Sequence, residues 1–250
     1  MIVANLATYP PRRDGLLDVV AALAPQVDRI NVILNEYAEV PLELAALGNV
    51  NPVIPHENTM DVGKFYVAPD PEDTVFYVDD DIHPGIDFIE RTVERFEALG
   101  PGRWLGGYHG SLYTRPTLRR PIKYLAYRPH RIAAHRDIIA CNNELDRPKI
   151  MDQIATNSAI LRGRDAPPYD FMRDSRKFVD VRLARWCFAH DITPVCLPRK
   201  QDWLKVGRYG GDSIHNSFTS KHFRHVADEI WTYAFKVKGR DTYVPRSVGI

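Results

Sequence analysis

The chain has 250 residues, 44% of them hydrophobic, which is ample for the packed core of one large α/β domain or two small ones. Its net charge of +1 and isoelectric point near 7.8 give no overall attraction to nucleic acid or membrane, so an anionic partner must be met by a local patch. The three cysteines (Cys141, Cys187 and Cys196) include no Cys-x-x-Cys pair, and they favour buried thiols in a reducing compartment over disulfides or a zinc site.

The first hundred residues alternate apolar strands with helices. The N-terminus enters an apolar strand at once, without a basic segment or a long apolar run, so we expect a cytoplasmic protein without a signal peptide or transmembrane helix. We expect strands at residues 2–7, 30–34, 50–54 and 75–78, and helices at 14–24 with Asp14 as N-cap, at 41–47, and around 86–96. This alternation predicts an α/β fold with a mainly parallel central sheet flanked by helices, in which ligands gather at the carboxyl ends of the strands.

The second half of the chain is less regular. The pattern at 104–110 predicts a strand with a glycine-opened bend, and we expect further strands at 156–161 and 192–197. Residues 178–188 are typical of a helix that turns Val181, Ala184 and Phe188 inward. No internal repeat and no low-complexity segment marks a boundary, so we expect residues 1–250 to form a single domain.

Residues 115–136 form a basic stretch. They contain seven Lys/Arg residues and two histidines but no acidic residue, interleaved with Tyr124, Tyr127 and three prolines. This composition predicts a long loop or extension. It is either a solvated basic surface or a dock for an anionic acceptor or an anionic membrane face.

The most informative stretch is the apolar run 75–78 followed by Asp79, Asp80 and Asp81. It predicts a buried strand that ends at an exposed acidic tip. Three adjacent carboxylates repel one another, and at a strand end they favour a site for Mg²⁺ or Mn²⁺, which take oxygen ligands and bridge to phosphates. The alternative is an acidic turn in which one Asp caps the following helix.

The order of these parts resembles a nucleotide-sugar-dependent glycosyltransferase of the GT-A type, similar to the large family 2 group of bacterial enzymes. The matching pieces span roughly residues 2–200 and comprise residues 8–12, Asn35, the Asp61, Gly63 and Lys64 group, the acidic triplet, and Asp180 before an arginine-containing helix. The resemblance implies a GT-A (Rossmann-like) single domain. About residues 1–100 would bind the nucleotide-sugar, and about 101–250 would bind the acceptor and supply a C-terminal lid.

The resemblance also implies roles at the reacting centre. Asp81 would bind a Mn²⁺ or Mg²⁺ ion directly, with Asp79 as a second ligand and His215, or its rival His222, as the C-terminal ligand. Asp180 would be the general base of an inverting transfer, although Val179 stands before it where the family usually has Glu. Asp180 is alternatively an N-cap of its helix. Asp152 is the fallback base.

A donor pocket is expected beside the acidic tip. A strand-end loop with an aromatic residue and prolines gives a rigid wall for stacking a base, while polar side chains bond its edge and a lysine meets a phosphate. The candidates are Thr8, Tyr9, Pro10, Arg12, Asn35, Asp61, Gly63 and Lys64, with Asp79 and Asp80 for the ribose, the donor sugar or a metal-bound water. These residues do not separate uridine from guanosine, and we take a UDP-sugar as the first candidate donor. The expected acceptor is a glycan or lipid-linked glycan.

Two other functions fit part of the pattern. A haloacid-dehalogenase-like phosphatase would use Asp79 and Asp81, but His83 replaces the expected Thr or Val, and the motif is not near the N-terminus. A catalytically inactive nucleotide-sugar-binding module would gain nothing from three mutually repelling carboxylates. We expect no nucleic acid partner, because the basic stretch is single and the global charge is near neutral.

Overall fold

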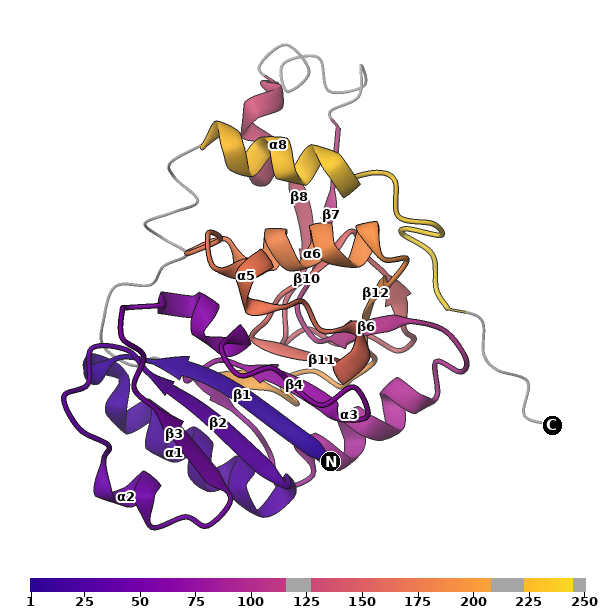
Figure 1. Cartoon of the computed structure of the whole chain (residues 1–250). Helices are drawn as coiled ribbons and strands as arrows, with labels where there is room; N and C mark the ends of the chain where they lie inside the picture. The colour runs from indigo at the N-terminus through magenta and orange to yellow at the C-terminus, as the bar shows by residue number, and fades with distance from the viewer. Residues whose placement is uncertain (116–126, 208–222, 245–250) are drawn as a thin grey trace.

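The computed structural model describes residues 1–115, 127–207 and 223–244. Its centre is an eight-stranded sheet with the strand order β3-β2-β1-β4-β11-β6-β12-β9 (Figure 1). The strands are β1 (Ile2–Thr8), β2 (Arg29–Leu34), β3 (Val50–Val53), β4 (Thr74–Val78), β6 (Trp104–Gly107), β9 (Lys149–Ile150), β11 (Ser158–Arg162) and β12 (Thr193–Cys196). The first four in this order are parallel to one another, β11 is antiparallel to both of its neighbours, and β12 is parallel to β6.

Helices cover both faces of this sheet because its strands are apolar on both sides. On one face, α1 (Arg13–Leu23) and α3 (Phe88–Glu97) pack against alternate residues of the strands, including Phe76 and Val78 of β4. On the other face, η3 (Met60–Phe65), α5 (Tyr169–Met172) and α6 (Val179–Ala189) pack against Val75 and Tyr77. The short α2 (Leu42–Ala45) lies beside β3. The predicted α/β fold, with a mainly parallel sheet between helices, is confirmed.

A second packed region lies beyond α6. A small sheet has the order β10-β7-β8, formed by β10 (Gln153–Ile154), β7 (Gly110–Tyr113) and β8 (Arg136–Ile139). The helix α8 (Arg224–Tyr233) and the turn η4 (Pro129–Ala134) cover α6 at the top of Figure 1. Their apolar side chains, among them Ile132, Val181 and Ile230, form a third hydrophobic cluster. The remaining strand pair joins β5 (Ile82–His83) to β13 (Lys205–Val206).

Three expectations about the elements are wrong. Phe188 of α6 is 37% exposed and does not turn inward with Val181 and Ala184. The single strand predicted at 104–110 is two strands in different sheets, β6 and β7, because the chain bends between Gly107 and Gly110. The first helix begins at Arg13, so Asp14 lies inside its first turn and is not the N-cap. The short strands β8, β9, β10 and β13 and the helix α8 were not anticipated. Across the residues that the structure describes, we find no helix of the length and apolarity needed to cross a bilayer.

Candidate active site

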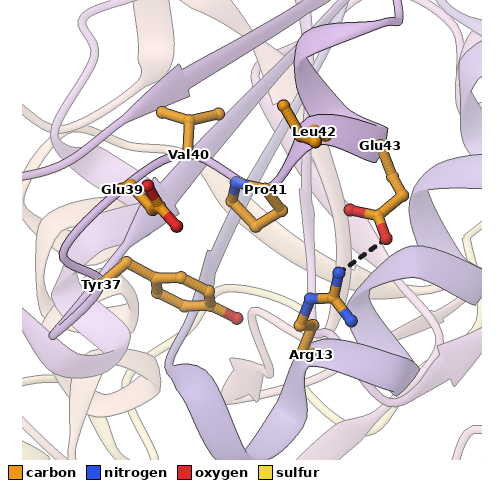
Figure 2. A pocket seen from close by; sticks show the side chains of 7 residues that line it. All are labelled: Arg13, Tyr37, Glu39, Val40, Pro41, Leu42 and Glu43. Carbon is orange, nitrogen blue, oxygen red and sulfur yellow. Dashed lines mark hydrogen bonds and ion pairs between the residues drawn. The ribbon is translucent and has the colours of Figure 1, made fainter.

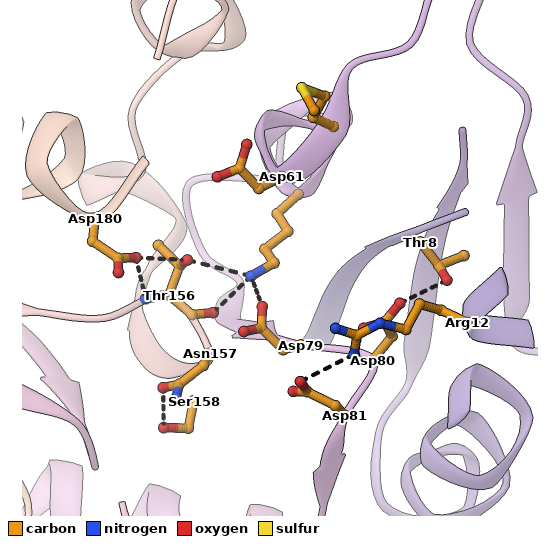
Figure 3. Close-up of polar contacts among 12 residues, drawn as sticks. Thr8, Arg12, Asp61, Asp79, Asp80, Asp81, Thr156, Asn157, Ser158 and Asp180 are labelled. Carbon is orange, nitrogen blue, oxygen red and sulfur yellow. Dashed lines mark hydrogen bonds and ion pairs between the residues drawn. The ribbon is translucent and has the colours of Figure 1, made fainter. Parts of the chain in front are cut away.

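The acidic triplet lies where two halves of the chain meet at one edge of the sheet. Thr8 and Asp79 end up at this edge because β1 and β4 are parallel neighbours, whose carboxyl ends coincide. β11 runs the opposite way, so the residues just before it, Thr156 and Asn157, arrive at the same edge. The Asn157 carbonyl accepts a hydrogen bond from the Asp79 N–H at 3.1 Å and joins the two segments. Figure 3 shows Asp79 beside Thr156 and Asn157.

Arg12 and Thr8 hold two of the three carboxylates. Arg12 Nη1 donates to Asp80 Oδ1 at 3.4 Å and to Asp81 Oδ2 at 3.1 Å. Thr8 Oγ1 donates to the other Asp80 oxygen, Oδ2, at 2.7 Å. The Asp80 side chain is therefore buried and bonded on both oxygens, whereas 23% of the Asp81 side chain is exposed. The loop after β1, which the sequence assigned to the donor, thus also orders the acidic tip.

The electrostatics of the tip favour a further cation. Burial raises the pKa of Asp80 to about 6; Thr8 and Arg12 oppose this effect, and the charge of Asp79 adds to it. Burial also raises the pKa of Asp81, and the charge of Asp79 adds to it again. Two positive side chains, Arg12 and Lys64, contact the three carboxylates, so the cluster keeps an excess of negative charge.

Lys64 extends from η3 into the space between Asp79 and Thr156. Its side chain is only 4% exposed, and its ammonium forms an ion pair with Asp79 and donates to the carbonyl and Oγ1 of Thr156, both at 3.3 Å. Burial acts to lower the pKa of Lys64, but Asp79, Asp180 and Asp61 together raise it above its ordinary value, so the group stays charged. An ammonium has three N–H groups, and all three are engaged by these acceptors.

Asp180 lies at the start of α6 and is joined to this cluster through Thr156. Asp180 Oδ1 accepts the Thr156 N–H at 2.8 Å and the Thr156 hydroxyl at 2.9 Å (Figure 3). The N-cap of α6 is Phe178, and its side chain makes no capping bond. The alternative role of Asp180 as an N-cap is therefore wrong, and its carboxylate points instead toward the edge that carries the acidic triplet.

Two more of the predicted donor residues make contacts within the protein. The buried Asn35 amide donates to the carbonyls of Thr8 and Met60, and its oxygen accepts two hydrogen bonds from Thr59. Asp61 Oδ1 accepts the Lys177 N–H at 2.8 Å, and burial raises the pKa of this carboxyl to about 6. These bonds tie η3 to the sheet edge on one side and to the segment before α6 on the other.

Gly63 allows η3 to approach the sheet closely. A Cβ at this position would lie 2.7 Å from Thr59 Oγ1 and 3.0 Å from the Ala7 Cβ, so no larger residue fits without displacement. Tyr9 and Pro10 lie at the start of η1 (Pro10–Arg12), where Pro10 is exposed and Tyr9 half-buried. Among the predicted donor residues, Asp79 also presents its side chain to solvent, with 38% of it exposed.

A hollow of about 490 Å³ opens beside the loop after β1 (Figure 2). It is lined by Arg13, Tyr37, Glu39, Val40, Pro41, Leu42 and Glu43. Arg13 Nη2 donates to Glu43 Oε1 at 2.6 Å across its rim. Burial raises the pKa of Tyr37; the positive charge of Arg13 opposes this effect, and the negative charge of Asp80 adds to it.

Both carboxylate oxygens of Asp152, the fallback base, are occupied by hydrogen bonds within the protein. Its side chain is fully buried, and its two oxygens accept hydrogen bonds from the N–H groups of Tyr113 and Phe235 and from two nitrogens of Arg240. It stabilises the connection between β7 and the segment after α8. Its assignment as a base is wrong, because no acceptor hydroxyl can reach it.

The donor set at the tip fits a hard cation in part. Asp79 and Asp81 each keep one carboxylate oxygen without a bond to Lys64 or Arg12, and Mg²⁺ is commonly held by one or two carboxylates plus phosphates. Among the described residues, no group of three or more His, Cys, Asp or Glu side chains is arranged to hold a metal ion. His215 and His222 lie outside the described residues, as do residues 116–126 of the basic stretch.

The sequence missed Thr156, Arg13 and Tyr37. Thr156 is the first residue of the strand predicted at 156–161, and only the antiparallel pairing of β11 with β4 brings it beside the acidic triplet. Arg13 and Tyr37 each directly follow a predicted donor loop, at Arg12 and Asn35, so extending those loops by one or two residues would have found them.

Comparisons with known proteins give similarity of shape only. No family model and no curated protein matches the sequence. One similar solved structure is a mycobacterial protein with 14% identity and a TM-score of 0.48, in a match that covers 94% of this chain and 74% of that one. Another is glucosyl-3-phosphoglycerate synthase from Mycobacterium tuberculosis, solved with phosphoglyceric acid, with 13% identity, a TM-score of 0.49, and coverage of 94% and 80%. At these values, we infer no activity from the matches.

Proposed function

We propose that this protein is a metal-dependent glycosyltransferase of the GT-A type, which moves a sugar from a nucleotide-diphosphate sugar to a glycan or lipid-linked glycan acceptor with inversion. The observation that carries the proposal is the meeting of Asp79, Asp81 and Asp180 at one sheet edge. Glycosyl transfer needs the charge of the leaving diphosphate neutralised and a base for the acceptor hydroxyl. The two ends of this cluster offer groups for the two tasks.

Asp81 and Asp79 would hold a Mn²⁺ or Mg²⁺ ion, with His215 as a further ligand. When bound, such an ion neutralises charge on the diphosphate of the donor. The excess negative charge of the cluster and the exposed part of each side chain, 38% for Asp79 and 23% for Asp81, support this assignment. Arg12, which already contacts Asp81, would meet the same diphosphate.

The nucleoside would occupy the hollow beside Tyr37, with Tyr9 and Pro10 at its approach and a UDP-sugar as the first candidate donor. Its volume of about 490 Å³ lies in the range of ligand pockets. Within this proposal, residues of about 1–100 bind the donor and those of about 101–250 face the acceptor, in a single domain. Asp180 Oδ2 would take the proton of the acceptor hydroxyl, because Oδ1 is occupied by Thr156.

The distribution of charge supports an anionic acceptor or an anionic membrane surface near the second half. Residues 1–100 contain 6 Lys/Arg and 18 Asp/Glu residues, whereas residues 101–250 contain 27 and 14. The net charge of the whole chain is near zero because an acidic first half and a basic second half cancel each other. We propose that the stretch 115–136 contacts the inner face of the cell membrane in a cytoplasmic enzyme, where a lipid-linked acceptor would be presented.

A phosphatase that uses Asp79 and Asp81 and an inactive nucleotide-sugar-binding module are the rival functions. Lys64 contacts Asp79 and is linked through Thr156 to Asp180. This link between the acidic triplet and a further carboxylate favours a transferase, which needs a base, over the two rivals. Metal-dependent release of a nucleoside diphosphate from a nucleotide-sugar supports the transferase. Hydrolysis of a simple phosphomonoester supports the phosphatase, and binding without turnover supports the module.

The direct test is a thermal-shift screen of UDP, GDP and other nucleoside diphosphates with and without Mn²⁺. A ligand at 100 times its dissociation constant stabilises the protein by about 2.7 kcal/mol, which is easily measured. We expect stabilisation by one nucleotide that is lost on adding EDTA. A screen in which no nucleotide stabilises the protein, with or without the metal, contradicts the proposed function.

A further inference from the structure

An unbroken polar chain joins the acidic triplet to Asp180. It runs from Asp79 to Lys64, from Lys64 to Thr156, and from Thr156 to Asp180 (Figure 3). The four residues come from the end of β4, from η3, from the segment before β11 and from the start of α6. Four separate elements therefore meet at these few side chains.

Thr156 is the junction of this chain. Its hydroxyl accepts a hydrogen bond from Lys64 Nζ at 3.3 Å and donates to Asp180 Oδ1 at 2.9 Å, which uses its single proton. Its backbone N–H donates to the same Asp180 oxygen at 2.8 Å. The side chain is only 2% exposed, so no water competes for these bonds.

Two donors on one oxygen fix how Asp180 is presented. Oδ1 is held from two directions, which restricts rotation of the carboxylate and leaves Oδ2 on the other side. Within the described part of the chain, Oδ2 receives no hydrogen bond from another residue. An oxygen without a partner among the described residues, on a carboxylate whose rotation is restricted, has the geometry of a positioned proton acceptor.

Lys64 acts as the second support. It is buried, and all three of its N–H groups are used by Asp79 and Thr156, so it is not free to meet a donor phosphate, the role that the sequence suggested. Its contact with Asp79 ties the position of Thr156 to the carboxylates at the end of β4. Movement of the acidic triplet would therefore be transmitted to Asp180.

We propose that Thr156 is a positioning residue that aligns Asp180 for proton transfer and, through Lys64, holds this base in register with the donor-binding carboxylates. The inference rests on the proposed glycosyl transfer with Asp180 as base. It assigns a role to a residue outside the resemblance to known glycosyltransferases, and it gives Lys64 a different one.

A series of substitutions at position 156 tests the hydroxyl. Thr156→Ser keeps the hydroxyl as donor and acceptor, and Thr156→Cys keeps a weak donor. Thr156→Val keeps the shape and the backbone N–H bond to Asp180 but loses both bonds of the hydroxyl. We expect the kcat for release of the nucleoside diphosphate to fall in the order Thr, Ser, Cys, Val, with Val lower by about 10- to 100-fold, the effect of a misplaced catalytic group. The KM for the donor should stay within about twofold, because Thr156 does not touch it.

The assay uses the UDP- or GDP-sugar that is turned over fastest with Mn²⁺, and water as the acceptor. Ser158→Ala is the matched control, since it removes another buried hydroxyl of the same segment, one that donates to Asn157 and not to Asp180. If Thr156→Val does not fold, the comparison of Ser with Cys decides, because both are small and differ mainly in hydrogen bonding.

A second measurement separates alignment from simple loss of stability. In the Asp180→Asn background, Thr156→Val should lower kcat no further, because the carboxylate that it positions is gone. Three results would each overturn the role of Thr156. They are full activity of Thr156→Val, a loss of kcat in Thr156→Ser as large as that in Thr156→Val, and a loss of kcat on adding Thr156→Val to Asp180→Asn as large as in the wild-type background. If the wild-type protein itself turns over no nucleotide-sugar, the proposed function has failed and not only this extension of it.

Discussion

The two halves of the chain build the site in different ways. In residues 1–100, parallel strands deliver polar loops to one edge of the sheet, and each loop begins where an apolar run ends. In residues 101–250, the site residues depend on β11, which runs antiparallel to its neighbours, and on α6, which packs on the face of the sheet away from α1 and α3. The first half gathers carboxylates with the cations that contact them, and the second contributes the carboxylate proposed as base.

The difference shows that site residues at the ends of parallel strands can be predicted from the local sequence. Site residues brought in by an antiparallel strand cannot, because their position depends on a pairing that the local sequence does not reveal. Asp79 is placed by its own strand, but Thr156 reaches it only because β11 pairs antiparallel with β4. If the division of roles is correct, substitutions in the first half should abolish donor binding. Those at Asp180 should leave donor binding intact and stop the transfer.

The largest effect is expected for Asp81→Ala. This change removes a proposed metal ligand and one of the two carboxylate partners of Arg12, so Mn²⁺-dependent binding of the nucleoside diphosphate and turnover should both be lost. The protein should stay folded, because Arg12 keeps its contact with Asp80. Isothermal titration with and without Mn²⁺ measures the binding, and circular dichroism checks the fold. Glu90→Ala, which removes an exposed carboxylate of α3, is the control. Normal metal-dependent binding of the nucleoside diphosphate by Asp81→Ala would show that Asp81 is not a metal ligand.

Asp180→Asn should separate binding from transfer. The amide keeps the size of the side chain and can still accept the hydrogen bonds from Thr156, but it cannot take a proton. We expect the affinity for the donor to change little and kcat to fall by roughly 10²–10⁴-fold, the usual contribution of a general base. Steady-state kinetics and titration of the same preparation give both quantities. A variant with unchanged kcat would show that the base lies elsewhere.

Much of the fold and the first half of the site follow from the sequence. The apolar runs predict β1, β2, β3 and β4 within one or two residues, because each is bounded by polar or turn-forming residues. The acidic triplet and the loop 8–12 meet as expected, since parallel neighbours share an edge. The sequence cannot tell that Asn35 and Lys64 face inward, because the same polar residue types serve ligands and buried networks alike.

In the second half, β11, α6 and β12 lie close to their predicted positions, but other elements were missed for a reason that lies in their contacts. β8, β9, β10 and β13 are two to four residues long, too short to show a period, and they exist only because distant segments pair with them. Asp152 is the fallback base predicted from the sequence. Only the three-dimensional structure reveals Arg240, almost ninety residues away, as its partner.

Asp152→Asn tests whether Asp152 stabilises the fold while Asp180 serves as the base. The buried pair with Arg240 would lose its charge, and an amide cannot accept on both of its polar atoms, so the free energy of unfolding should fall by about 3–5 kcal/mol. Urea denaturation measures this loss. Turnover per folded molecule, at a temperature where the variant is folded, should stay near that of the wild type. A stable variant without turnover would instead restore Asp152 as a base.

The smallest effect, and the one that probes the link between the halves, is expected for Asp61→Asn. The pKa of Asp61 is about 6 in the folded protein, above its ordinary value of 3.8, because burial disfavours the charged form. The folded state therefore binds this proton more tightly than the unfolded state. The contribution of the group to stability falls as the pH rises from about 4 to about 6, and its cost is complete above that range.

Asparagine removes this cost while its oxygen can still accept the Lys177 N–H. The free energy of unfolding of Asp61→Asn relative to wild type should therefore increase between pH 4.5 and pH 7.5, by at most about 3 kcal/mol. Urea unfolding at both pH values measures the change, with Asp170→Asn as an exposed control. Parallel stability curves for Asp61→Asn and wild type would mean that Asp61 is solvated in the folded protein. The bond from η3 to the segment before α6 would then be too weak to couple the donor side to Asp180.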